Sequence, residues 1–547
     1  GLTALGAALL FSSLGQPALW EDEAESALRA VSILETGLPR VTVGGVLVTT
    51  QSSLAPFEGD AAGVWTWNTW LPAYLVAGSF AVFGRTPFAA RLPFALAAVL
   101  TLWLAWRLFR ASEKDELAAA RPWAPEAGLA MLALSAPFLL FARQSRYYAL
   151  VALGTVLVLL AWRALLGKRT WGALAVALAL NFLFHASFAF AAVAALALLL
   201  DALLRWDECP RAPRFWGAAA LTFVLLAPAA WYFRVWDRHG NHGYGAAEGL
   251  EFLKTFLLWG ARFAVPLALP AAVLLKRAAL KKRAAPLLVL AAGAAVYIGA
   301  CGEGAFSRLA AAAALAALAA EALAAPAPHG VMSLRRMSAL FLLATLGLLS
   351  FTAAEPYGRY LAGLLPLTAF LCGRWVSELA GGRAWAVAGL AAALAVEGAF
   401  YAWPVRAAAA LAGPAPVESV SGMMRLRLRE APRRSELARY VAGLGQPGYV
   451  EPVAVALRAG GESFFNDADP LALLFLTGRR PDYDLAGEPD WLLPSAWTRL
   501  SPARDAKVKA LLASGRYEAV AVEGPRVLWQ NNPDPLYREP FPSRGPL

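Results

Sequence analysis

The sequence predicts an α-helical polytopic membrane protein with about thirteen transmembrane helices, interface helices in its first outer loop and a small C-terminal α/β soluble domain. Composition is the first reason, because 59% of the 547 residues are hydrophobic and only 16% are charged, whereas soluble domains are less apolar and more charged. Distribution is the second reason. The apolar residues gather in nearly uncharged windows of about twenty residues, the length needed to cross a hydrocarbon core of about 30 Å.

The expected spans follow one another through a transmembrane domain of residues 1–403. By hydropathy they cover residues 1–19, 88–109, 124–141, 148–166, 171–184, 187–204, 215–233, 250–275, 284–300, 309–325, 338–353, 360–378 and 384–403. The first span runs directly into an acidic segment without a small-residue cleavage pattern. We therefore expect it to remain as a helix rather than to be removed as a signal peptide.

Basic residues in the short connections predict the orientation of these spans. They are Lys276, Arg277, Lys281, Lys282 and Arg283 in one connection, with Lys168, Arg169, Arg335 and Arg336 in two others. Because cytoplasmic loops carry an excess of Lys and Arg, these connections are expected to face the cytoplasm of a bacterial inner membrane. The clusters also explain much of the formal charge of +11, so no nucleic-acid partner is expected.

The first long loop, residues 20–87, is expected on the opposite, outer side of the membrane. It contains an acidic helix-like stretch at residues 22–35 and an amphiphilic, tryptophan-rich stretch at residues 64–83. Tryptophan prefers the headgroup level of a bilayer, so we expect the second stretch to lie on the membrane surface rather than to cross it.

A change in composition after residue 403 predicts a soluble domain of residues 404–547, which would face the periplasm or the exterior. Prolines mark the linker, and charged residues become frequent after it. Helical patterns then alternate with strand-like runs, which is typical of a small α/β domain. The helices are expected at residues 433–443 and 502–514, and the strands at residues 449–457 and 517–522.

The strongest candidate for chemistry is a group of four carboxylates within residues 21–25, directly after the first expected span. Charges held at a membrane interface are costly unless they are solvated, paired or used in a function. One such function is that of a base, in which Asp22 or Glu23 would deprotonate an acceptor hydroxyl or amine as a sugar is displaced from phosphate. The alternative is a solvated helix start, where acids favour the N-terminus and Glu25 pairs with Arg29.

Two further clusters combine arginine with tyrosine at the outer ends of expected spans. They contain Arg143, Arg146 and Tyr147 in one case and Glu355, Arg359 and Tyr360 in the other. Arginine binds phosphate oxygens with a planar fork, so the three arginines are candidates for holding a donor phosphate. Snorkelling arginines with tyrosines of the interface belt would give the same pattern without a role in function.

His185 lies between two short expected spans and would face outward. With Tyr147, Tyr360 and Glu355 it is a candidate for lining a substrate pocket, and a structural role at a helix turn is the alternative. In the loop 237–244, one aspartate and two histidines could bind a divalent cation, although their spacing matches no standard ligand set. The glycines of this loop favour a mobile segment that closes over substrate, so no metal ligand is assigned. No other cofactor is expected.

Several short motifs resemble the membrane glycosyltransferases of the dolichyl-phosphate-mannose protein mannosyltransferase type, a part of the GT-C superfamily that includes the bacterial lipid A aminoarabinose transferases. In chain order the motifs are Asp22-Glu23-Ala24, Leu71-Pro72-Ala73-Tyr74, Phe83-Gly84-Arg85, Ala90-Arg91-Leu92-Pro93, Arg143-Gln144-Ser145-Arg146-Tyr147, and Arg359-Tyr360 followed by Pro366. The resemblance covers most of the transmembrane domain and leaves the C-terminal domain unexplained.

The resemblance implies an inverting transfer of a sugar from a polyprenyl-phosphate donor to a lipid, glycan or protein acceptor on the outer side of the membrane. It makes Asp22 the matching catalytic carboxylate, with Glu23 beside it. Arg146 and Arg359 become candidates for binding the donor phosphate. The aminoarabinose enzymes usually carry a basic residue shortly after the acidic pair, where this chain has Ala24 and Glu25, and this departure argues against an aminoarabinose donor or a lipid A acceptor.

Two other classes of protein stay open at this point. A transporter or flippase of a lipid-linked saccharide would share the many spans and the basic interface, but transporters place charged groups near the middle of their spans. Here most charges lie at the ends of the expected spans, with Arg262, Glu321 and Glu397 as exceptions. A non-catalytic scaffold for the outer domain would leave the acidic cluster unexplained.

Overall fold

The computed structural model describes most residues between 1 and 236 and between 329 and 389, together with short segments of the C-terminal region. Its longest gaps within the first two ranges are residues 49–57 and 116–122. The chain forms two compact units, one of Gly1–Phe11 with Phe94–Ala408 and one of Ser12–Pro93 with Ala409–Leu547.

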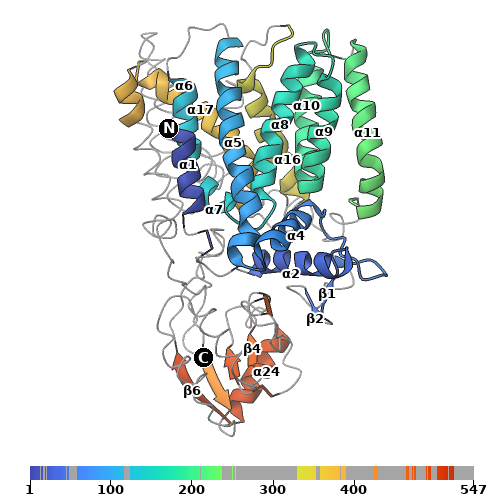
Figure 1. The fold of residues 1–547 in the computed structure, drawn as a ribbon, viewed down its shortest axis with the longest axis vertical. Helices are drawn as coiled ribbons and strands as arrows, with labels where there is room; N and C mark the ends of the chain where they lie inside the picture. Colours follow the sequence, from blue (N-terminus) through green and yellow to red (C-terminus); the bar gives the residue numbers. More distant parts are fainter. Residues whose placement is uncertain are drawn as a thin grey trace. The chain divides into compact units, whose positions relative to one another are not determined.

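The first unit is a helix bundle. Its elements are α1 (Leu2–Phe11), most of α5 (Pro87–Asp115), α6 (Ala124–Ala133), α7 (Ala136–Ala142), α8 (Tyr148–Leu166), α9 (Gly172–Ala186), α10 (Phe188–Leu204), α11 (Pro213–Phe233), α16 (Leu334–Thr352), the 3-10 helix η3 (Gly358–Leu364) and α17 (Leu365–Leu379). Helix α9 packs against α8, α10 and α11, and these four helices run side by side (Figure 1).

Among the described residues, α5, α8 and α11 have the length and apolar composition required to cross a membrane. These helices differ in how much of their surface is buried. Most of α8 is buried within the bundle, with Val156 and Leu159 fully buried. By contrast, α11 leaves Trp231 75% exposed and Phe223 72% exposed. The structure therefore places α8 inside the bundle and α11 at its periphery.

Helices α5, α8, α9, α10, α11 and α16 are present where spans were predicted at 88–109, 148–166, 171–184, 187–204, 215–233 and 338–353, and of these α5, α8 and α11 are long and apolar enough to cross a membrane. The predicted spans at 250–275, 284–300 and 309–325, and most of 384–403, lie outside the described residues. The count of thirteen spans therefore stays a prediction.

Three predicted spans were wrong in their extent. The helix expected at 1–19 ends at Phe11. The helix expected at 124–141 breaks at Leu134 and Ser135, because the Ser135 hydroxyl accepts a hydrogen bond from the Phe138 backbone N–H and caps a new helix. The helix expected at 360–378 begins as a 3-10 turn, and Pro366 occupies the first turn of the α-helix that follows.

Two glycines allow α6 and α17 to pack closely. A Cβ atom on Gly128 would lie 3.2 Å from the carbonyl oxygen of Ala369 and 3.2 Å from the Phe109 ring. A Cβ atom on Gly373 would collide with the backbone of Gly128 itself. Small residues at a helix interface let backbones approach, which is a common way for membrane helices to associate.

The second unit contains two groups of elements. The first is α2 (Glu21–Thr36), the short antiparallel strands β1 (Thr42–Val43) and β2 (Val46–Leu47), α4 (Leu71–Phe83) and the start of α5. The acidic stretch predicted at 22–35 is confirmed as α2. The stretch predicted at 64–83 becomes helical only from Leu71, and α4 packs against α2 with the Tyr74 hydroxyl donating to the Gly37 carbonyl oxygen at 2.7 Å. Its position on the membrane surface stays a prediction.

The second group is a mixed sheet with strand order β4-β5-β3-β6. Its elements are β3 (Met424–Leu428), β4 (Phe464–Asn466), β5 (Trp491–Leu493), α24 (Pro502–Ala513) and β6 (Tyr517–Val522). Strand β3 pairs antiparallel with β5 and β6, while β4 pairs parallel with β5. The predicted helix at 502–514 and strand at 517–522 are confirmed, and the elements predicted at 433–443 and 449–457 lie outside the described residues. The domain boundary at 403 and 404 stays a prediction.

Candidate functional site

The acidic cluster predicted as a base forms the first turn of α2. Carboxylates are favoured there because the N-terminus of a helix carries a partial positive charge. Successive residues of a helix point about 100° apart, so neighbouring acids have different surroundings. Glu23 is fully buried, whereas Asp22 is half-buried.

Glu23 is held by Arg91 from the start of α5. The Arg91 Nε donates to Oε1 of Glu23 at 2.8 Å, and Nη2 donates to Oε2 at 2.5 Å. The remaining Nη1 donates to the carbonyl oxygen of Leu14 at 3.1 Å. Both side chains are nearly inaccessible, with 1% exposure for Glu23 and 6% for Arg91. A bidentate arginine compensates the carboxylate charge and occupies both oxygens, so this pair is suited to fixing the helix start rather than to accepting a proton.

Two turns further along α2, the buried Arg29 holds the segment that follows the helix. Its guanidinium donates to the carbonyl oxygens of Arg40, at 2.6 Å, and Val48, and to the carboxylates of Glu25 and Glu58, at 3.3 Å each. The Trp65 ring centroid lies 4.9 Å from its Cζ. The predicted pairing of Glu25 with Arg29 is confirmed, so the interpretation of the cluster as a helix start accounts for Glu25.

Asp22 differs from both neighbouring acids. Its backbone carbonyl oxygen accepts a hydrogen bond from the Ser26 hydroxyl at 3.1 Å, which is a contact of the helix itself. Its side chain keeps partial exposure, while the carboxylates of Glu23 and Glu25 are bound to arginines. Asp22 is therefore more exposed than Glu23, the buried acid next to it in the chain.

The first arginine–tyrosine cluster forms the turn between α7 and α8 in the first unit. Arg143 is buried and Arg146 is half-buried, with the Arg146 Cζ 5.8 Å from the centroid of the Tyr147 ring. The Tyr147 and Tyr148 ring centroids are 4.7 Å apart. Tyr148 also lies edge-on to Phe141 at 5.4 Å. Aromatic packing thus fixes the turn that carries the two arginines.

The second arginine–tyrosine cluster lies beside the turn between α7 and α8. Helix η3, which contains Arg359 and Tyr360, packs against α7 and α8. Ala362 of η3 belongs to one buried group with Phe141 and Tyr148, and Tyr147 packs against that group. The structure therefore brings together the two segments predicted to hold a donor phosphate. The Arg359 side chain and the whole of Glu355 lie outside the described residues.

The remaining predicted site residues have fewer described neighbours. His185 is half-buried at the end of α9, with its ring edge-on to Phe184 at 5.4 Å. Tyr360 is half-buried in η3. The loop 237–244 lies outside the described residues. Across the described part of the chain, no three His, Cys, Asp or Glu side chains are grouped so as to hold a metal ion.

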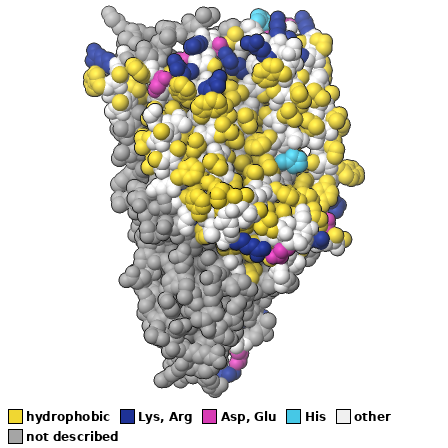
Figure 2. Space-filling model, viewed as in Figure 1, with side chains coloured by type: hydrophobic (Ala, Val, Ile, Leu, Met, Phe, Trp, Pro, Cys, Tyr) yellow, Lys and Arg dark blue, Asp and Glu magenta, His cyan; other side chains and the backbone are white. Residues whose placement is uncertain are grey.

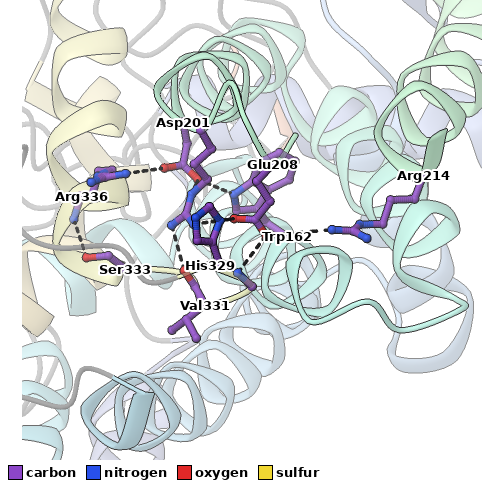
Figure 3. Close-up of polar contacts among 10 residues, drawn as sticks. Trp162, Asp201, Glu208, Arg214, His329, Val331, Ser333 and Arg336 are labelled. Atoms are coloured by element: carbon purple, nitrogen blue, oxygen red, sulfur yellow. Dashed lines mark hydrogen bonds and ion pairs between the residues drawn. The ribbon is translucent and has the colours of Figure 1, made fainter. Parts of the chain in front are cut away.

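A second network of buried charges lies at the ends of α8, α10 and α16 in the first unit (Figure 3). Asp201 Oδ2 accepts from the Trp162 Nε1 at 2.9 Å and from the Arg205 Nε at 3.0 Å, and Oδ1 lies 3.9 Å from the Arg336 Nη1. Glu208 accepts from the Gly330 backbone N–H at 2.8 Å. The contacts of Asp201 join α8, α10 and α16. The hydrogen bond from Gly330 to Glu208 connects the segment before α16 with the segment after α10. The network did not emerge from the sequence.

Arg91 and Glu58 were also missed as partners by sequence reasoning. A single arginine near the start of an apolar helix is expensive to bury alone and therefore signals a carboxylate partner somewhere in the chain. That signal does not say which carboxylate, because Glu23 and Arg91 are 68 positions apart.

The chain is similar to two solved structures over most of its length. No protein-family model matches the chain, and no curated protein matches it. The crystal structure of ArnT from Cupriavidus metallidurans in the apo state is similar, with 15% identity and a TM-score of 0.41 over 95% of this chain and 96% of that chain. ArnT from the same organism bound to undecaprenyl phosphate has 14% identity and a TM-score of 0.36, over 93% and 90%. At these values the similarity assigns no activity and no residue role to this chain.

Proposed function

We propose that this protein is an inverting membrane glycosyltransferase that moves a sugar from a polyprenyl-phosphate donor to an acceptor on the outer side of the membrane. Asp22 is the catalytic base. The observation that carries the proposal is the different surroundings of two adjacent acids. Arg91 holds both oxygens of Glu23, whereas Asp22 is half-buried beside this pair. The motifs that resemble lipid-donor glycosyltransferases include these same two residues.

In the proposed reaction, an acceptor hydroxyl or amine attacks the anomeric carbon of the sugar. A bond forms between the acceptor and that carbon while the bond from the carbon to the phosphate oxygen breaks, and the electron pair leaves with the phosphate. The acceptor proton passes to Asp22, because a carboxylate within hydrogen-bond reach can act as a general base. Attack from the face opposite the phosphate inverts the anomeric configuration.

The leaving polyprenyl phosphate gains negative charge, which positive side chains stabilise. Arg143 and Arg146 in the turn between α7 and α8, with Arg359 in η3, are the proposed phosphate ligands. Support comes from the packing of η3 on this turn, which gathers the three arginines' segments in one part of the first unit. We propose that Tyr147, Tyr360, His185 and Glu355 line the pocket for the sugar.

In this proposal Glu23 is a positioning residue, although the sequence left it open as a second base. Its ion pair with Arg91 connects the start of α2 to the start of α5. Because breaking a buried ion pair leaves one charge uncompensated, Glu23 is expected to contribute to the folded arrangement of Asp22 rather than to proton transfer.

A transporter of a lipid-linked saccharide is the second candidate. A transport pathway calls for ionisable groups near the middle of membrane helices. Within the described residues, Asp201 lies in the last turn of α10, Glu113 and Asp115 lie in the last turn of α5, and the buried Arg374 inside α17 is ion-paired with Glu113. This distribution supports the enzyme over the transporter.

The test is sugar release from a panel of purified polyprenyl-phosphate monosaccharides by the full-length protein in nanodiscs. Asp22→Asn is expected to lower turnover by about 10²–10⁴-fold, the usual contribution of a general base. Glu35→Gln is the matched control, because it neutralises an exposed acid on the same helix. Turnover retained in Asp22→Asn would remove the catalytic assignment. Movement of a lipid-linked saccharide across vesicles without sugar release would favour the transporter.

A further inference from the structure

One face of α5 carries an exposed stripe of side chains that are apolar in the middle of the helix and basic toward its C-terminal end. The stripe consists of Leu96, Leu100, Trp103, Arg107, Arg110 and Lys114. These positions are three and four apart, so they lie on one side of an α-helix. Leu96 is 54% exposed, and Leu100 and Trp103 are each 42% exposed. Figure 2 shows Lys and Arg side chains gathered along the upper edge of a broad hydrophobic face.

The two arginines of the stripe are stacked on tryptophans of the same helix. The Arg107 Cζ lies 5.0 Å from the centroid of the Trp103 ring, and the Arg110 Cζ lies 5.1 Å from that of Trp106. Stacking on an aromatic face restrains a guanidinium and leaves its N–H donors at the ring edge available to another acceptor. Arg107, Arg110 and Lys114 are all exposed.

The carboxylates at this end of α5 are bound elsewhere. Glu113 forms an ion pair with Arg374 of α17, with 2.9 Å between Oε1 and Nη1. Asp115 forms an ion pair with Arg163 of α8, also at 2.9 Å. In the part of the chain that the structure describes, the three cations of the stripe have no carboxylate partner. The stripe therefore ends in three positive charges that no acid of α5 neutralises.

The spacing of the stripe matches one leaflet of a bilayer. With a rise of 1.5 Å per residue, Arg107 lies about 17 Å along the helix from Leu96. Half of a hydrocarbon core of about 30 Å is about 15 Å. The leucines thus occupy acyl-chain depth, Trp103 occupies the interface that tryptophan prefers, and the cations lie at the level of the phosphate.

We propose that this stripe binds an anionic phospholipid of the leaflet at the C-terminal end of α5. Its acyl chains lie along Leu96 and Leu100, and its phosphate accepts hydrogen bonds from Arg107, Arg110 and Lys114. A zwitterionic headgroup would bring its own cation against three others, so the site selects a lipid with net negative charge. Two copies of the stripe would place like charges against each other, which argues against self-association through this face.

The test is native mass spectrometry of the full-length protein titrated with phosphatidylglycerol and phosphatidylcholine of the same acyl chains. The variant Arg107→Gln/Arg110→Gln/Lys114→Gln is expected to raise the Kd for phosphatidylglycerol about a hundredfold, at about fivefold per cation, and to leave phosphatidylcholine binding unchanged. The single change Lys114→Gln, expected to give about a fivefold rise, replaces the triple variant if that variant does not fold.

The matched control is Lys168→Gln/Arg169→Gln/Arg211→Gln, which removes the same charge from three exposed positions outside α5. It is expected to change the Kd for phosphatidylglycerol by less than about threefold, since diffuse attraction alone is weak and screened. Equal losses in the two triple variants would overturn the proposal, as would equal affinity of the unmodified protein for the two lipids. A change of oligomeric state with unchanged lipid affinity would make this face a protein interface and would also overturn it.

Discussion

Two regions of the molecule are built from buried arginines and carboxylates, but they differ in how far their acids are exposed. In the network around Asp201, the described carboxylates are bound to tryptophan, arginine or backbone donors (Figure 3). At the start of α2, Arg91 and Arg29 bind Glu23 and Glu25, and Asp22 keeps partial exposure. The first network joins helices of the bundle, and at the start of α2 a partly exposed acid lies next to a buried ion pair.

The largest expected effect on stability comes from Arg91→Ala. It leaves the Glu23 carboxylate buried and uncompensated, which typically costs about 3–5 kcal/mol. We expect a lower thermal unfolding temperature and less folded protein, measured by light scattering and size-exclusion chromatography in detergent. The double variant Glu23→Gln/Arg91→Gln removes both charges and should recover part of the loss. Wild-type stability of Arg91→Ala would show that the ion pair does not hold the start of α2.

A smaller effect is expected from Arg146→Ala, which tests the turn between α7 and α8. Hydrogen bonds to charged groups contribute about 1.5–3 kcal/mol, so the KM for the lipid donor should rise about tenfold to a hundredfold. The KM for the acceptor should stay nearly constant, because the proposed partner of Arg146 is the donor phosphate. Arg146→Lys is the control, because it keeps the charge and loses the planar fork. Its KM for the lipid donor should lie between those of the unmodified protein and Arg146→Ala. Equal changes for donor and acceptor would indicate a snorkelling arginine without a phosphate role.

The smallest effect concerns Cys209, beside the Asp201 network. Burial raises the pKa of the Cys209 thiol to about 12, and the negative charges of Glu208 and Asp201 add to this effect. Because the thiolate is the reactive form, alkylation by iodoacetamide at pH 8 should be at least about tenfold slower in the folded protein than in denaturant. Peptide mass spectrometry measures the rate at this cysteine. Rapid alkylation of the folded protein would show that the network is open to water.

Sequence reasoning succeeded where the signal was local. The bounds of α8 follow from an apolar run that ends at Gly167 and Lys168, and the pairing of Glu25 with Arg29 follows from their i,i+4 spacing. It failed at the break before α7, because hydropathy does not register the Ser135 cap. It also missed β3, whose sequence alternates arginine with apolar residues and lacks the β-branched residues that mark most strands.

Long-range pairing explains most of what the sequence could not predict about the site. An acidic cluster and a lone arginine were both visible, but their pairing depends on the fold, which joins Glu23 to Arg91 across 68 positions. That pairing is what distinguishes Asp22 from its neighbour. The packing of η3 against the α7–α8 turn likewise depends on tertiary contacts, although both segments were recognised separately.

The most direct test of the account measures sugar transfer per folded molecule and thermal stability together, in Asp22→Asn and Asp201→Asn. We expect Asp22→Asn to lose about 10²–10⁴-fold in turnover while its unfolding temperature stays close to that of the unmodified protein. Asp201→Asn should lose stability, because the buried Arg205 loses its ion pair with the Asp201 carboxylate, while each folded molecule keeps its turnover. Full turnover in Asp22→Asn, with transfer shown for the unmodified protein, would contradict the account.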